Sequence, residues 1–356
     1  MNGIPCMLMR GGSSKGAYFL GTDLPTDPDA RDDLLLAIMG SPDDRQIDGI
    51  GGAHPLTSKV AVVTPSADAA ADVDYLFLQV SVGEAIVSDR QNCGNLLAGV
   101  APFALERGLV DVQPEVAEAS LRIRMRNTDA IATATFAVAD GRPSYDGDTA
   151  ISGVPGTSSA IRLLFEDIAG GTTGALLPSG ATSDIVDGVE CTLIDNGMPV
   201  VVVRADAVGV TGYESCEVLE GNASLRATLE SIRRRAGHLM NLGDVSDTTV
   251  PKLTMVAAPQ DGGDLCTRTF IPDRCHDAIG VLGAVSVATA ALLPGSPAGQ
   301  VLAANSAGSV VLEHPSGTFE ASVSVRTGSD GVAVDHAGII RTARKLMDGT
   351  VFPRSS

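Results

Sequence analysis

Two apolar segments place the strongest constraint on how this chain can fold. The first runs from about Asn95 to Leu109 and the second from about His276 to Leu293. Both have the length of helices and are apolar on most faces, so other parts of the protein must enclose them. Most of the remaining chain has the pattern of short strands between Gly, Asp and Pro turns. The sequence therefore predicts an α+β fold in which each half has one helix enclosed by strands.

The second apolar segment also has to be tested as a membrane helix. Residues Ala278–Pro294 carry no charge, but they are mainly Ala, Gly, Val and Ser. They fall short of the roughly 20 strongly apolar residues of a typical span. We therefore expect a helix buried inside a domain and no membrane partner.

The remaining elements follow from periodicity and composition. Strands are expected at Val60–Thr64, Val73–Val80 and Ala132–Val138, where β-branched or alternating apolar residues occur. Two amphipathic helices are expected at Asp29–Met39 and Ala223–Leu242. The layout suggests a duplicated unit, with a boundary in the Gly-rich region 155–180.

Composition excludes several classes of function. The net charge is −18, aromatic residues make up 3% and Trp is absent, which argues against nucleic-acid binding. An acidic protein still binds a small anion where local donors outweigh the overall field. The five histidines show no paired ligand spacing, so no metal is expected. Scattered cysteines without a CxxC motif, and a start without a secretory signal pattern, predict a cytoplasmic protein.

The first candidate site is the cluster RGGSSKG at Arg10–Gly16. It lacks the GxxxxGK[ST] spacing of a phosphate-binding loop. Its backbone N–H groups and two hydroxyls could still hold a carboxylate. The alternative is a simple turn between two strands, since glycine and serine are common in turns.

Lys59 is the most interesting residue of the second cluster, Ile47–Lys59. The glycines there do not complete a GxGxxG pattern, because His54 stands in the way. Lys59 opens an apolar strand, and removal from water would favour a neutral amine that acts as a base. The alternative is a solvated lysine at a strand end, as most lysines are exposed.

The third cluster, Asn92–Asn95, immediately precedes the first apolar helix. This places the Cys93 thiol and free N–H groups where a thiolate or carboxylate is favoured. The alternative is an N-cap turn with an inert cysteine. Arg274–Asp277 is expected to open the second apolar helix in the same way. Weaker turn signals occur at Leu177–Gly180, Asp195–Pro199 and His314–Gly317.

Six separated motifs occur in a fixed order along nearly the whole chain: RGGSSKG, IDGIGG with TSK, NCGN, DNGMP, HPSG and TARKLMDG. In these motifs the sequence resembles the 2-methylaconitate isomerase and 4-oxalomesaconate tautomerase family. The resemblance implies a diaminopimelate epimerase-like fold of two similar domains, each a central helix wrapped by a curved sheet, with the active site in the cleft between them. It implies domains of residues 1–165, to which about 340–356 return, and 166–339.

The resemblance also implies a cofactor-independent isomerase that shifts a proton in an unsaturated polycarboxylate. The start of the chain and RQIDGIGGA look closest to the 4-oxalomesaconate tautomerases of gallate and protocatechuate degradation. Lys59 and Cys93 are the implied catalytic residues, on either side of the reacting carbon. The partner is a small tricarboxylate, and a homo-oligomer is allowed. The implied substrate-binding residues are Arg10, Gly11, Gly12, Ser13, Ser14, Lys15, Ser58, Asn92, Gly94, Asn95, Met198, Arg268, His276 and Ser316.

Three alternatives stay open. One is 2-methylaconitate cis–trans isomerisation, which needs the same base and the same anion sites. Another is a non-catalytic accessory protein that binds polycarboxylates. The third is a cysteine-dependent racemase of amino acids, which would need a second thiol in the second half. Our preferred alignment places Cys275 just outside the reacting position, which argues against the racemase hypothesis.

Overall fold

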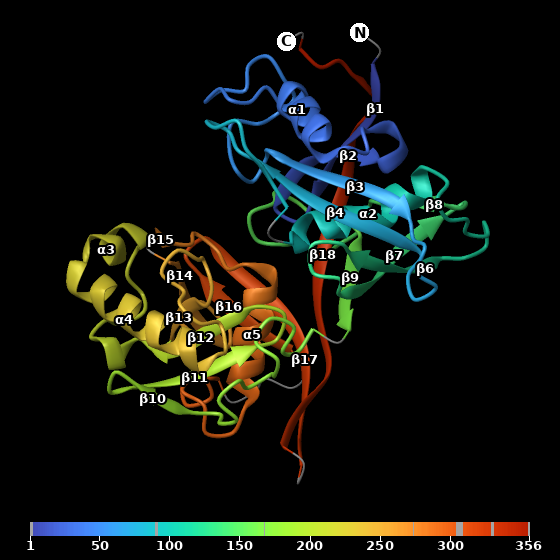
Figure 1. Ribbon diagram of the computed structural model, residues 1–356. Helices are drawn as coiled ribbons and strands as arrows, with labels where there is room; N and C mark the ends of the chain where they lie inside the picture. Colours follow the sequence, from blue (N-terminus) through green and yellow to red (C-terminus); the bar gives the residue numbers. More distant parts are fainter. Residues whose placement is uncertain are drawn as a thin grey trace. The chain divides into compact units, whose positions relative to one another are not determined.

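The computed structural model describes residues 3–89, 92–166, 168–272, 274–303, 309–328 and 331–354 (Figure 1). The chain divides into two compact units. Unit 1 comprises Met1–Glu166 and Ile340–Ser356, and unit 2 comprises Asp167–Ile339. Each unit has a mostly antiparallel sheet and one central helix, labelled α2 and α5 in Figure 1.

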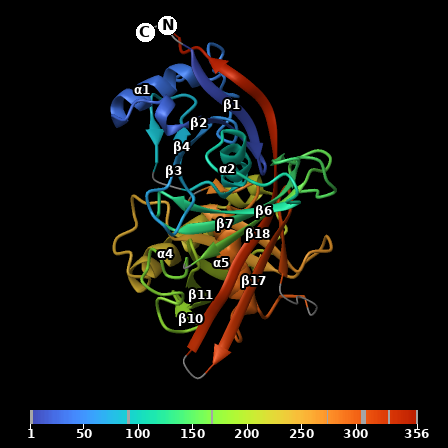
Figure 2. The same cartoon turned by 90° about the vertical axis from the view of Figure 1, so that its right-hand side faces the viewer.

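Unit 1 is built on strands that run through the first 166 residues. β1 pairs antiparallel with β2, β2 parallel with β3, β3 antiparallel with β4, β4 parallel with β6, and β6 antiparallel with β7. β1 also pairs with the end of β18, so the two chain ends lie side by side in Figures 1 and 2. The elements are β1 (Ile4–Gly11), β2 (Ser14–Leu20), η1 (Gly21–Asp23), α1 (Pro28–Met39), β3 (Lys59–Pro65), β4 (Val73–Val80), β5 (Val87–Ser88), α2 (Gly94–Glu106), β6 (Glu118–Met125), β7 (Ile131–Ala139), β8 (Arg142–Pro143) and β9 (Ala160–Glu166).

The two helices of unit 1 cover opposite faces of β3. Ile38 and Met39 of α1 pack in one core cluster with Val60 and Val62. Because side chains alternate along a strand, Lys59 at the head of β3 belongs to the other face. That face is the one against which α2 packs, and almost every residue of α2 is buried.

Unit 2 repeats the same order of pairings. β11 pairs antiparallel with β12, β12 parallel with β13, β13 antiparallel with β14, β14 parallel with β16, and β16 antiparallel with β17. The duplication that the sequence suggested only by its layout is therefore visible in the strand order. The elements are β10 (Asp184–Val186), β11 (Val189–Asp195), β12 (Pro199–Arg204), η2 (Asp206–Val208), α3 (Cys216–Gly221), α4 (Ala223–Leu239), β13 (Lys252–Ala257), β14 (Leu265–Ile271), β15 (Arg274–Cys275), α5 (Val281–Leu292), β16 (Ser309–His314) and β17 (Gly317–Gly328). The last strand, β18 (Gly331–Val351), begins in unit 2 and ends in unit 1.

Most predicted elements are confirmed, and one boundary is wrong. The helices expected near residues 29–39, 95–109 and 223–242 are α1, α2 and α4. The second apolar helix begins at Val281 instead of His276, with Gly280 as its N-cap. Arg274 and Cys275 pair with the end of β14, and the Ala278 N–H donates to His276 Nδ1 at 2.9 Å. Arg274–Asp277 therefore ends a β-hairpin and does not open the helix.

The charge-free segment forms α5, whose residues are mostly buried against β12 and β17. The expectation of a helix buried inside a domain is confirmed. Within the described part of the chain, no helix combines the length and apolarity needed to cross a membrane.

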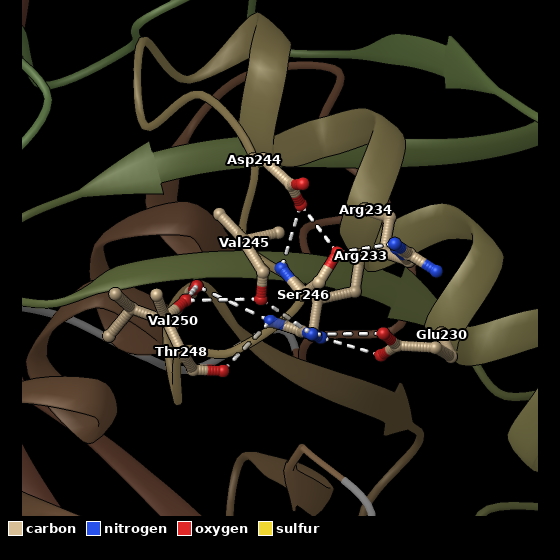
Figure 3. A network of polar contacts seen from close by, with 8 residues as sticks. All are labelled: Glu230, Arg233, Arg234, Asp244, Val245, Ser246, Thr248 and Val250. Atoms are coloured by element: carbon tan, nitrogen blue, oxygen red, sulfur yellow. Dashed lines mark hydrogen bonds and ion pairs between the residues drawn. The ribbon is translucent and has the colours of Figure 1, made fainter.

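A buried arginine holds the connection from α4 to β13 (Figure 3). Arg233 is 2% exposed and forms two hydrogen bonds with the Glu230 carboxylate, at 2.6 and 2.9 Å. Its other N–H groups donate to the carbonyls of Val245, Thr248 and Val250 at 3.0, 3.2 and 3.3 Å. One side chain thus satisfies three carbonyls of the loop that leads into β13.

We expect Arg233→Ala to lower the free energy of unfolding by about 1–3 kcal/mol, because the Glu230 carboxylate and the Thr248 carbonyl lose the donor observed here. The Val245 and Val250 carbonyls keep their bonds from Thr248. Urea unfolding followed by circular dichroism measures the change. Arg234→Ala is the matched control on the same helix, since Arg234 is exposed and bonds to Ser246 only at the surface. Equal midpoints for the two variants would contradict this role for Arg233.

Candidate active site

The turn of the RGGSSKG motif packs against the start of α2. Gly12 has φ +52°, and a Cβ there would lie 2.2 Å from Asn95 Oδ1. A Cβ at Gly11 would lie 2.5 Å from the Asn95 carbonyl oxygen. The Asn95 Nδ2 group donates to Ser13 Oγ at 3.3 Å. Two motifs that are far apart in the sequence therefore meet, and the glycines are what permits the close approach.

Ser14 presents a buried hydroxyl to this region. It is 2% exposed, and its Oγ has no hydrogen-bond partner among the described residues. Ser14 and Gly16 lie on one face of β2, and Gly16 is the cross-strand partner of Lys59. Ser14 therefore faces the same side of the sheet as Lys59. An unpaired buried hydroxyl costs about 1–3 kcal/mol, so this donor is available for a ligand.

Lys59 is a buried amine with a neutral partner. It is 7% exposed, and its Nζ donates to Gln79 Oε1 at 2.9 Å. The Nζ atom also lies 4.9 Å from the centre of the Phe77 ring. Within the described residues Lys59 forms no ion pair. The observed surroundings of the amine are therefore an uncharged amide and an aromatic ring.

Gln79 fixes the position of the Lys59 amine. Its Nε2 group donates to the carbonyls of Ser58 and Pro55 at 2.9 and 3.1 Å. Those two bonds turn the Oε1 atom toward Lys59. Sequence reasoning missed Gln79 because its contact with Lys59 is a cross-strand pair, set by the register of β3 and β4.

The hydroxyl of Ser58 is already hydrogen-bonded within the protein. It is fully buried, and its Oγ accepts from Gln46 Nε2 at 2.7 Å. Gln46 was also missed, although it belongs to the RQIDGIGGA motif. Its Oε1 accepts from the Ala53 N–H at 2.9 Å, so it holds the glycine loop in place. The substrate-binding role of Ser58 stays a prediction, and its observed role is to position the loop before Lys59.

The predicted position of Cys93 at the start of a buried helix is confirmed. Cys93 is the N-cap of α2, is 9% exposed, and its thiol makes no capping hydrogen bond. Its carbonyl accepts from Tyr75 OH at 3.2 Å. Burial raises the pKa of Tyr75 well above its usual value, so the phenol stays a donor. Among the described residues, the first-turn N–H groups from Gly94 to Leu96 have no observed acceptor, so they can bind an external one.

Besides Ser14 Oγ, a second buried polar atom without a described partner lies at the start of α2. Asn92 Nδ2 donates to Thr128 Oγ1 at 2.7 Å, whereas Asn92 Oδ1 is buried without a partner in the described structure. Tyr75, Phe77 and Gln79 alternate along β4 and so share one face. This row of side chains links Cys93 at one end to Lys59 at the other.

A row of three cations crosses the neighbouring strands. Arg10 on β1 lies opposite Lys15 on β2 and opposite Arg344 on β18. Cross-strand partners have neighbouring side chains, so this row supplies a local positive field in an acidic protein. Lys15 also brings two motifs together, since a Cβ at Gly52 would lie 3.4 Å from its Nζ.

Arg10 itself is half-buried and mainly holds the turn. It donates to the Gly12 carbonyl at 2.9 Å, to Thr342 Oγ1 at 2.8 Å and to Ser158 Oγ at 3.1 Å. Burial, and then the charge of Arg344, lowers the pKa of Arg10. Direct substrate binding by Arg10 stays a prediction.

In unit 2, the DNGMP turn packs against α5 much as RGGSSKG packs against α2. Ser286 Oγ donates to the Met198 carbonyl at 2.7 Å, and the Asn196 N–H donates to the same Ser286 Oγ at 3.1 Å. Ser316 Oγ donates to the Asp277 carbonyl at 2.6 Å, next to His276. Two of the predicted residues, His276 and Ser316, thus come from segments that lie together.

Arg268 faces the other side of its sheet. Cys266, Arg268 and Phe270 occupy every second position of β14, so their side chains share one face of the sheet. Cys266 and Phe270 belong to the core cluster that packs against α4, so Arg268 lies on that side. Its guanidinium donates to the carbonyls of Glu214 and Thr267, both at 2.9 Å. The observed contacts of Arg268 hold the approach to α3, and a substrate contact stays a prediction.

The position in unit 2 that corresponds to Cys93 holds a glycine. Cys93 is the N-cap of α2, and Gly280 is the N-cap of α5. Cys275 lies earlier in the chain, in β15, with its Sγ 2.9 Å from Cys216 Sγ. A racemase with opposed thiols at two helix starts would therefore lack its second thiol at this position.

Comparisons with known proteins agree with this architecture. The solved structure of a methylitaconate-delta-isomerase is 36% identical, with a TM-score of 0.87, and the match covers 98% of this chain and 95% of that one. Amino-acid epimerases and racemases share the fold at much lower identity. The predicted epimerase-like fold is confirmed.

The family model described as PrpF protein matches residues 1–354. A (4E)-oxalomesaconate Delta-isomerase of Novosphingobium sp. (strain KA1) is 56% identical over 354 residues, which cover 99% of this chain and 98% of the relative. A 4-oxalomesaconate tautomerase of Pseudomonas putida (strain ATCC 47054) is 56% identical over 351 residues, covering 98% and 95%. The chain belongs to the PrpF family.

Two buried serines test the interpretation of the free hydroxyl. We expect Ser14→Ala to keep or slightly raise the free energy of unfolding, because it removes a buried donor that has no partner. Ser58→Ala is the matched variant, and it should lower that free energy by about 1–3 kcal/mol because Gln46 Nε2 loses one of its two acceptors and keeps only Ser41 Oγ. Urea midpoints compare the two. A larger loss for Ser14→Ala than for Ser58→Ala would show that Ser14 serves the fold.

Proposed function

We propose that this protein is a cofactor-independent isomerase that moves a proton within 4-oxalomesaconate. The observation that carries the proposal is Lys59, a buried amine held by a neutral amide on the face that Ser14 also lines. The substrate is supported by the names of the two relatives that are 56% identical over nearly the whole chain.

Lys59 acts as the base in this mechanism. A C–H next to carboxylate and keto groups that conjugate with a double bond is acidic, because the carbanion delocalises into a dienolate. The neutral amine of Lys59 removes this proton, and the resulting ammonium keeps its hydrogen bond to Gln79. The substrate itself accepts the electron pair, so the step requires no cofactor.

The anionic groups of the substrate are held by donors on the same face. The N–H groups of the turn 11–14, the Ser14 hydroxyl and the first turn of α2 bind carboxylates and stabilise the dienolate. Lys15 alternates with Ser14 and Gly16 along β2, so the row formed by Arg10, Lys15 and Arg344 belongs to the other face and adds positive potential from there. This local field is what lets a chain of net charge −18 bind a tricarboxylate.

The proton returns at a second atom, which sets the product. Return to a carbon shifts the double bond, and return to oxygen gives the enol tautomer. The names of the two relatives differ on this point. In the mechanism Lys59 returns the proton, or the Cys93 thiol supplies it from the other side. Proton magnetic resonance of the product formed by the purified protein distinguishes the two outcomes.

We also propose a cytoplasmic location, with no nucleic-acid or membrane partner. The scattered cysteines without a CxxC motif and the strong negative charge support this. The fold leaves a homo-oligomer open.

Lys59→Ala should keep the fold and lose at least about 10²-fold in rate, the low end for a general base. Lys59→Arg should lose a similar factor, because a guanidinium keeps the charge but does not become neutral. An ultraviolet assay with freshly generated 4-oxalomesaconate, run beside 2-methyl-cis-aconitate, measures both variants. Activity of Lys59→Arg near that of the wild type would reduce Lys59 to an electrostatic anchor.

The two substrates in that assay separate the remaining alternatives. Turnover of the aconitate alone would keep the base but change the substrate. Binding of both compounds without turnover would favour an accessory binding protein. Our proposal requires fast turnover of 4-oxalomesaconate that depends on Lys59.

Gln79→Glu should lower the rate at pH 7 by about 10-fold or more, because a carboxylate beside Lys59 stabilises the ammonium form. The rate should recover as the pH rises, so the acidic limb of the pH–rate profile moves to higher pH. Gln79→Met removes the hydrogen bond without adding charge, and it should lower the rate without that displacement. Identical profiles for the two variants would contradict the positioning role of Gln79.

A further inference from the structure

Two cysteine side chains of unit 2 lie in direct contact. Cys216 is the first residue of α3, and Cys275 is the last residue of β15. Their Sγ atoms are 2.9 Å apart. This is shorter than the roughly 3.5–4.0 Å at which even carbon atoms pack. The two residues are far apart in sequence, so the fold alone brings the sulfurs together.

The two thiols differ in their exposure. Cys216 is half-buried, whereas the other five cysteines of the chain are buried. Cys275 is 7% exposed, and burial followed by the proximity of Cys216 raises the pKa of its thiol. Cys216 is therefore the thiol that a dissolved oxidant reaches first, and Cys275 is the buried thiol in contact with it.

Hydrogen bonds on both sides fix the backbone segments that carry the two cysteines. The Cys275 N–H donates to Glu220 Oε1 at 3.0 Å, which ties β15 to the far end of α3. The Glu214 carbonyl, just before α3, accepts from Arg268 at 2.9 Å. The segment that carries Cys216 is thus anchored on both sides, and separation of the sulfurs would break these contacts.

We propose that Cys216 and Cys275 are a redox-sensitive pair that closes to a disulfide when the protein meets a peroxide. This inference goes beyond the proposed isomerase activity and does not depend on it. Closure needs the sulfurs to reach roughly 2.05 Å, an approach of roughly 0.9 Å from the observed 2.9 Å.

The chemistry balances with hydrogen peroxide as the oxidant. The Cys216 thiolate attacks one peroxide oxygen, the O–O bond breaks, and hydroxide leaves to take up the thiol proton as water. Cys216 then carries a sulfenic acid. The Cys275 sulfur attacks the Cys216 sulfur, the S–O bond breaks, and the hydroxyl leaves with the Cys275 proton as a second water. Two thiols have lost two electrons and two protons to one peroxide.

The disulfide would join α3 covalently to β15. The residue that follows Cys275 is His276, and its carbonyl already lies 3.8 Å from Cys216 Sγ. Oxidation would therefore fix the backbone beside one of the predicted substrate-binding residues. A thiol reductant such as dithiothreitol would restore both thiols.

The test is peptide mapping of the full chain after treatment with hydrogen peroxide. Remaining thiols are alkylated under denaturing conditions without reductant, and the protein is digested and analysed by mass spectrometry. We expect a peptide pair linked through Cys216 and Cys275, the loss of two of the six thiols, and full recovery with dithiothreitol. Cys191→Ser, which removes a fully buried thiol of the same unit, should behave like the wild type.

A second variant separates this proposal from simple packing of two small side chains. Cys275→Ser leaves Cys216 without its partner, so Cys216 should accumulate sulfenic acid that dimedone traps. The wild type under the same treatment should show at least about 10-fold less dimedone adduct at Cys216, because Cys275 consumes the sulfenic acid. Equal adduct in both proteins, or disulfides spread over several cysteines, would overturn the proposal.

Discussion

The chemistry that we propose depends on one buried amine. Lys59 is removed from water at the head of β3, and its observed hydrogen-bond partner is an amide oxygen. Among the described residues no carboxylate pairs with this amine, so its surroundings are the Gln79 amide and the Phe77 ring. The residues around Lys59 hold its amine in this buried position.

The enclosed helix α2 packs on the face of the sheet that carries Lys59. Because α2 is buried along almost its whole length, it must lie directly on the sheet. Gly16 allows the approach, since a Cβ there would lie 2.8 Å from the Leu96 side chain and 2.7 Å from the Lys59 carbonyl oxygen. The same approach brings the uncapped start of α2 to the face that carries Lys59. The packing of α2 on the sheet thus encloses the face that carries Lys59 and also brings the first-turn N–H groups of the helix to that face.

Much of this arrangement could be predicted from local sequence. The apolar helices, the strand that Lys59 opens and the position of Cys93 follow from patterns within about ten residues. Gln79 could not be found this way, because its contact with Lys59 depends on strand register. Arg10 and Arg268 carry charges that the sequence alone suggests for a substrate, yet their observed hydrogen bonds go to backbone carbonyls, hydroxyls and the Cys266 sulfur of the protein. The late start of α5 was missed because Arg274 and Cys275 pair with β14.

The most direct test of the role of Lys59 is exchange of substrate hydrogen with solvent. Proton magnetic resonance in deuterium oxide follows loss of the C–H signal of 4-oxalomesaconate in the presence of the wild type or Lys59→Ala. We expect rapid exchange at the reacting carbon with the wild type and at least about 10²-fold slower exchange with Lys59→Ala. Exchange at equal rates in the two proteins would show that another group removes the proton and that Lys59 is not the base.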